Sequence, residues 1–126
     1  MKIKVDYVFD NNVQFTSNYG VGIGKLIDGV PQLNQDYYVE FEIREIFSIL
    51  DFNVVDTEKS IIKRVNDKLL LTMQLIDYED TGCASFMLGD TVIDIETKYH
   101  DDFKKLINKY LSLQVADLYL YSVDIF

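Results

Sequence analysis

Residues 69–97 read LLLTMQLIDYEDTGCASFMLGDTVIDIET, and this stretch decides what kind of fold the chain can form. It contains two or three apolar runs, each short enough for a strand, separated by polar residues that suit turns. The apolar residues predict the centre of a β-sheet. The stretch has no Lys or Arg, and its acids are Asp77, Glu79, Asp80, Asp90, Asp94 and Glu96. Most of the charge asymmetry of the chain therefore comes from the same segment as its predicted core.

Two short polar pairs indicate how the strands of this region connect. Asn66-Asp67 separates two apolar runs and suits a tight hairpin turn. Gly89-Asp90 allows two arrangements: a type II′ hairpin with glycine at its first central position, or a bulge in one long strand. The sequence leaves both open.

Strict alternation predicts two further strands outside this stretch. In the first, the residues on one apolar face are Ile3, Val5, Tyr7 and Phe9. In the second, apolar residues at odd positions from 37 to 43 alternate with a polar face that holds Glu40 and Glu42. We expect the apolar face of each strand to be core and the other face to meet solvent or a partner.

One late α-helix is predicted near residues 101–111. Its apolar stripe, spaced i, i+3, i+4, i+7 and i+8, consists of Phe103, Leu106, Ile107, Tyr110 and Leu111. Asp101 and Asp102 at its start and Lys109 near its end would complement the helix dipole. After the helix the pattern predicts a return to strand that continues to residue 126.

The fold class predicted from these elements is mainly β, an α+β arrangement with an antiparallel sheet and one late helix. The sheet either curls into a partial barrel of the OB type or carries the helix on one face. At 126 residues the chain has the length of a single domain, spanning residues 1–126. It is long enough to bury a core without disulfides or a metal.

Net charge narrows the classes of partner. The chain carries 21 acids and 12 bases, a formal charge of −9. Such a charge repels phosphate backbones and anionic lipid surfaces and favours a basic partner. Nucleic-acid binding is therefore disfavoured.

Cysteine usage and hydropathy indicate where the protein works. Cys83 is the only cysteine, so no internal disulfide can form, and we interpret it as a small buried hydrophobe. No apolar run approaches the length of a membrane span, and the alternating N-terminus does not read as a signal peptide. We expect a cytoplasmic protein with no membrane association.

No catalytic or cofactor motif accompanies these strands. The glycines of residues 19–25, YGVGIGK, lack the spacing of a phosphate-binding or dinucleotide-binding loop and predict a closely packed or bulged strand. His100 and Asp101 would not face each other on a helix. Glu40 and Glu42 point the same way, which solvation of an exposed face explains better than glycoside chemistry. We expect no metal, no cofactor and no enzymatic activity.

The function predicted is protein binding. We expect a small acidic domain that masks a basic partner, in the manner of an immunity or inhibitor-type protein. The candidate partner-binding residues are Asp77, Glu79, Asp80, Asp90, Asp94, Glu96, Glu40 and Glu42. Two alternatives stay open: an OB-like domain that binds single-stranded nucleic acid, and a structural or assembly subunit. The identity of the partner and the oligomeric state are not determined by the sequence.

Overall fold

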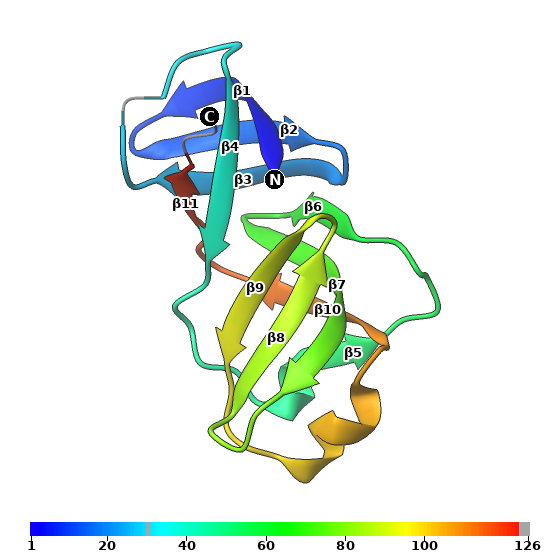
Figure 1. The fold of residues 1–126 in the computed structure, drawn as a ribbon. Helices are drawn as coiled ribbons and strands as arrows, with labels where there is room; N and C mark the ends of the chain where they lie inside the picture. The colour runs from blue at the N-terminus through cyan, green and yellow to red at the C-terminus, as the bar shows by residue number, and fades with distance from the viewer. Residues whose placement is uncertain (30, 124–126) are drawn as a thin grey trace.

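The computed structural model describes residues 1–29 and 31–123, and most of these residues lie in β-strands (Figure 1). The strands are β1 (Lys2–Phe9), β2 (Asn12–Ser17), β3 (Gly20–Leu26), β4 (Asp36–Glu42), β5 (Phe52–Val54), β6 (Ile61–Val65), β7 (Lys68–Tyr78), β8 (Cys83–Leu88), β9 (Thr91–Glu96), β10 (Tyr110–Val115) and β11 (Tyr119–Ser122). Two short 3-10 helices accompany them, η1 (Ile49–Asp51) and η2 (Asp101–Leu106). The predicted mainly-β class is confirmed.

Five strands close into a barrel, which forms the upper part of Figure 1. β1, β2 and β3 form an antiparallel meander, and β4 pairs antiparallel with β1. β11 closes the barrel because it pairs antiparallel with β4 and parallel with β3. This is the five-stranded Greek-key arrangement of OB-type barrels, so the predicted curl of the sheet is confirmed.

The strands between β4 and β11 in the sequence build a second sheet, which forms the lower part of Figure 1. β6 joins this sheet to the barrel, since Gly20 of β3 pairs with Ile62 of β6. From β6 the order continues through β7 and β10 to β5, while β8 and β9 extend from the far half of β7. The buried side chains of the barrel and of this sheet form one hydrophobic cluster.

Bulges reverse the predicted alternation in two strands. In β1 the register with β2 shifts between Val5 and Tyr7, and in β7 the register with β8 shifts between Leu75 and Asp77. Each extra residue turns the following side chains to the opposite face. The prediction that Tyr7 lies on the apolar face of β1 is therefore wrong: Tyr7 is 59% exposed, and Val8 packs against the core instead.

The predicted α-helix over residues 101–111 is wrong in its type and length. Only Asp101–Leu106 is helical, and it is a 3-10 helix. Asn108 has a positive φ of 75° and donates its backbone N–H to the carbonyl of Leu75, which ends the helix. Tyr110 and Leu111 then belong to β10, paired with β7. Pairing along a central strand outweighed the helical spacing of the apolar residues.

The hairpin turns of the second sheet follow the sequence closely. Val65 pairs with Lys68 across Asn66-Asp67, which confirms that predicted turn. Leu88 pairs with Thr91, so Gly89-Asp90 is a two-residue hairpin and not a bulge. Gly89 alone in this turn has a positive φ, of 60°, as type II′ geometry requires. The predicted terminal strand is present as β11, while residues 124–126 lie outside the described part of the chain.

The glycine run of β3 marks close packing and not a ligand loop. A Cβ at Gly20 would stand 1.9 Å from the carbonyl oxygen of Ile62, and one at Gly22 would stand 2.6 Å from the ring of Phe15. The barrel and β6 approach each other at these two positions.

Among the described residues, no helix is long and apolar enough to cross a membrane.

Substituting Gly20→Ala is expected to cost at least about 3 kcal/mol of unfolding free energy, because the new Cβ meets backbone that cannot move aside. Gly29→Ala is the matched control. Gly29 also has a positive φ, of 86°, but a Cβ there meets nothing within 4 Å, so backbone strain of about 1–2 kcal/mol is its whole cost. Urea unfolding of both variants measures the difference. Equal losses would contradict the close approach of β3 and β6.

Candidate functional site

The outer face of β7, β8 and β9 carries four of the predicted acids. Asp77 of β7 and Asp94 of β9 lie on either side of Ser85 of β8, because both pair with it in register. The Ser85 hydroxyl donates a hydrogen bond of 2.7 Å to Asp94 Oδ1. Glu96 lies opposite Cys83, whose carbonyl accepts the backbone N–H of Glu79 at 2.9 Å. Four carboxylates thus surround the outer side of one strand.

The bulge in β7 is what places Asp77 on this face. Without it, Asp77 would follow Leu75 into the core, since both positions are odd. The extra residue directs Asp77 outward, and Tyr78 becomes the buried residue instead. The Tyr78 hydroxyl lies 2.9 Å from Thr97 Oγ1 and accepts the backbone N–H of His100, so this buried hydroxyl has hydrogen-bond partners.

β4 brings Glu40 and Glu42 to the same surface. Both point outward while Val39 and Phe41 are buried, as the alternation predicted. Together with Asp94 they line a hollow of about 470 Å³ between β4 and β9. Asp94 therefore connects the two groups of acids. We call the connected set the acidic face, and its members are Glu40, Glu42, Asp77, Glu79, Asp94 and Glu96.

The other two predicted acids are placed differently. Asp80 forms an ion pair of 3.2 Å with Lys104 of η2. Asp90 lies in the turn between β8 and β9 and does not line the hollow. The structure thus brings six of the eight candidate residues together and leaves Asp80 and Asp90 outside the set.

Only one base is engaged with the acidic face among the described residues. The Arg44 guanidinium hydrogen-bonds the Glu42 carboxylate, which holds the pKa of Glu42 below its usual range. Arg44 also donates a 3.0 Å hydrogen bond to the Tyr121 hydroxyl, and its guanidinium lies 3.8 Å from the ring centre of Tyr119. The remaining five acids form no ion pair in the described part of the chain. Their negative charge is not offset locally.

The sequence analysis did not predict the contacts that Arg44 makes with Tyr119 and Tyr121. Arg44 is close in sequence to Glu42, but Tyr119 and Tyr121 lie far along the chain. They meet β4 only because β11 pairs with it, placing Tyr119 opposite Glu42 and Tyr121 opposite Glu40. No local pattern in the sequence reports that pairing.

Cys83 lies half-buried on the outer side of β8, so its interpretation as a small buried hydrophobe is wrong. Partial burial raises the pKa of its thiol, and the surrounding carboxylates raise it further. The carboxylates that act on it are Asp94, Glu79, Glu96 and Asp77. A raised pKa keeps the thiol protonated at neutral pH, which is opposite to what a nucleophile needs.

His100 has a structural role at the start of η2. Its Nδ1 accepts the backbone N–H of Asp102 at 3.1 Å, which caps the helix. Among the described residues, no group of three or more His, Cys, Asp or Glu is arranged to hold a metal ion.

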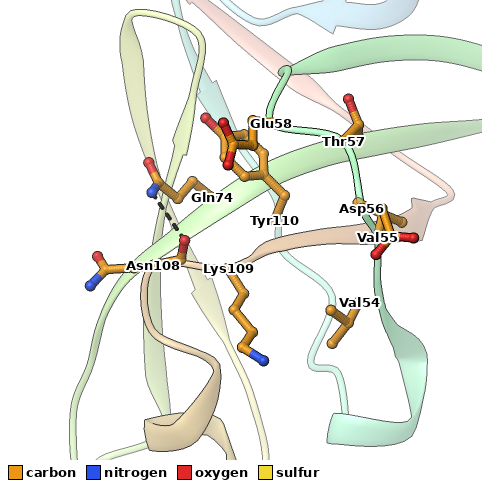
Figure 2. A pocket seen from close by; sticks show the side chains of 9 residues that line it. All are labelled: Val54, Val55, Asp56, Thr57, Glu58, Gln74, Asn108, Lys109 and Tyr110. Atoms are coloured by element: carbon orange, nitrogen blue, oxygen red, sulfur yellow. Dashed lines mark hydrogen bonds between the residues drawn. The ribbon is translucent and has the colours of Figure 1, made fainter.

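A separate polar hollow of about 520 Å³ lies beside β5, β7 and β10 (Figure 2). Figure 2 shows the 54–58 segment on one side of it and residues of β7 and β10 on the other, with Gln74 donating a 3.1 Å hydrogen bond to the carbonyl of Asn108. None of the predicted acids lines this hollow, and neither histidine nor cysteine does.

Comparison with known proteins gives no relative: no protein-family model, no curated protein and no solved structure matches the chain. The candidate site is therefore identified from its geometry and electrostatics alone.

The reactivity of Cys83 reports the electrostatic potential of the acidic face. Asp94→Asn is expected to lower the pKa of the Cys83 thiol, because it removes the largest of the charges that raise it. Alkylation by iodoacetamide should then begin at lower pH and run faster at any fixed pH below the plateau. Mass spectrometry of the time course measures this at the only cysteine of the chain. Asp90→Asn, a change outside the acidic face, should leave the profile in place, and equal profiles for Asp94→Asn and the unaltered protein would contradict the arrangement.

Proposed function

We propose that the protein is a non-enzymatic binding domain whose acidic face docks onto a basic protein and masks it, as an immunity or inhibitor-type protein does. One observation carries this proposal. Six acids from three separate segments of chain converge on one surface, and five of them have no ion-pair partner in the described residues. Unpaired like charges on one face repel each other and raise the free energy of the isolated protein. Binding of a cationic group relieves this repulsion.

The composition of the face suits a protein partner better than a small ion. Val92, which is 51% exposed, and the half-buried Tyr121 line the same hollow as Glu40 and Asp94. Protein interfaces combine such apolar anchors with a charged rim. The charges would speed encounter with a basic partner, and the apolar residues would slow its release.

Single-stranded nucleic-acid binding is the second candidate, and two observations favour it. The barrel is of the OB type, and at one end of β1 the exposed ring of Tyr7 lies 5.6 Å from the ring of the half-buried Phe9. Charge opposes it. The formal charge of −9 repels a phosphate backbone, and Lys25 of β3 is already paired with Asp117 at 3.9 Å.

Charge reversal tests the first candidate. The variant Asp77→Lys/Glu79→Lys/Glu96→Lys should bind a basic partner at least about tenfold more weakly, and binding of the unaltered protein should weaken from about 50 to 500 mM salt. The partner is first captured from extract on the immobilised protein, identified by mass, purified and titrated by calorimetry. The control Asp56→Lys/Glu58→Lys/Asp67→Lys makes the same change in net charge at exposed acids elsewhere.

Equal binding by the two variants would contradict the proposal. Salt-sensitive binding of single-stranded oligonucleotides by the unaltered protein, reduced by Tyr7→Ala, would support the second candidate instead.

A further inference from the structure

One edge of β9 is open over part of its length. In a two-residue hairpin the residues that flank the turn form a hydrogen-bonded pair, and such pairs then recur at every second residue. Thr91, Ile93 and Ile95 therefore direct their backbone groups toward β8. Val92, Asp94 and Glu96 direct theirs away from it. The Glu96 carbonyl confirms this, because it accepts the Phe47 N–H from the far edge at 3.1 Å.

Between Val92 and Asp94, no residue that the structure describes pairs with this edge. Within the described residues, neither residue makes a backbone hydrogen bond outside its hairpin with β8. β4 shows the same feature: Val39 exchanges hydrogen bonds of 2.9 and 3.0 Å with Met1, but Phe41, next on that edge, has no backbone partner there in residues 1–29 and 31–123. Phe41, Val92 and Asp94 all line the 470 Å³ hollow. The hollow thus lies where two strand edges are left unpaired.

An unpaired strand edge is a template for another extended chain. Charge decides which chain it accepts. A second copy of this protein would bring its own Asp94 and Glu40 to the edge, and the like charges would repel. A basic segment would be attracted. The protein already holds one guanidinium beside this hollow, since Arg44 bonds both Glu42 and Tyr121.

We propose that the hollow receives an extended basic segment of the partner, which pairs its backbone with Val92 and Asp94 and places an Arg or Lys side chain between Glu40 and Asp94. The proposal rests on the proposed function and specifies how the partner is held. The docked segment is short, about three residues, because Phe47 closes the edge at Glu96.

Proline at position 92 separates backbone pairing from charge attraction. The Val92 N–H points away from β8, so Val92→Pro removes a donor from the open edge without removing a ladder hydrogen bond. Val92→Ala is the matched control, because it also loses the valine side chain but keeps the N–H. The probe is a synthetic peptide of about eight residues that alternates Arg and Val, and a second copy of it carries N-methyl groups on alternate backbone nitrogens.

Amide hydrogen exchange and calorimetry provide the readouts. The peptide should slow exchange at Val92 and Asp94. Val92→Pro should weaken peptide binding about tenfold more than Val92→Ala, which loses only the apolar side chain, and Glu40→Gln/Asp94→Asn should separately weaken it about tenfold relative to the unaltered protein. The N-methylated peptide should bind about as weakly to the unaltered protein as the first peptide binds to Val92→Pro. The comparison of the two peptides tests backbone pairing even if Val92→Pro does not fold.

Distinct outcomes overturn the two proposals. If the partner and the peptide bind but neither proline nor N-methylation matters, edge pairing is wrong and the acidic-face function stands. Slow exchange at Val92 that depends on protein concentration without peptide would assign the edge to a second copy and also overturn it. If no basic protein binds and charge reversal has no effect, the proposed function itself fails.

Discussion

The backbone hydrogen bonds of β7 hold the second sheet together. β7 pairs with β10 along one edge and, along the other, with β6 over its first half and β8 over its second. Its inward side chains Leu71, Met73 and Leu75 are fully buried. β6 also pairs with β3, so β6 links the insertion, which is the second sheet formed by the strands between β4 and β11, to the barrel. Loss of register in β7 would displace every strand around it.

The position of the acidic face depends on a single irregularity in that strand. The bulge before Asp77 exchanges the faces of two consecutive residues, so that a carboxylate meets solvent and Tyr78 enters the core. A buried tyrosine hydroxyl is costly unless it is hydrogen-bonded. Here Thr97 donates to the Gly82 carbonyl at 2.6 Å, which leaves Thr97 Oγ1 free to accept the Tyr78 proton. The exchange therefore leaves neither residue in an unfavourable environment.

The candidate site lies where the barrel meets its insertion. β4 belongs to the barrel and β9 to the insertion, and Asp94 links the acids of both. An OB-type barrel supports many functions, so the barrel alone assigns none. What distinguishes this chain is the junction, where Glu40 and Asp94 line the hollow and form no ion pair within the described residues, while Glu42 is paired with Arg44.

The sequence by itself determined most of the strands, the turn at Asn66-Asp67 and the outward direction of Glu40 and Glu42, because alternation and turn residues are local signals. It also identified the acids of the face, although it included Asp80 and Asp90, which take other places. Only the tertiary structure decided which acids meet. The bulge at Ile76, the pairing of β10 that replaced the expected helix, and the closure of the barrel by β11 all arise from hydrogen bonds between segments far apart in the chain. Such bonds satisfy backbone groups that no local pattern can pair, so they override local preference.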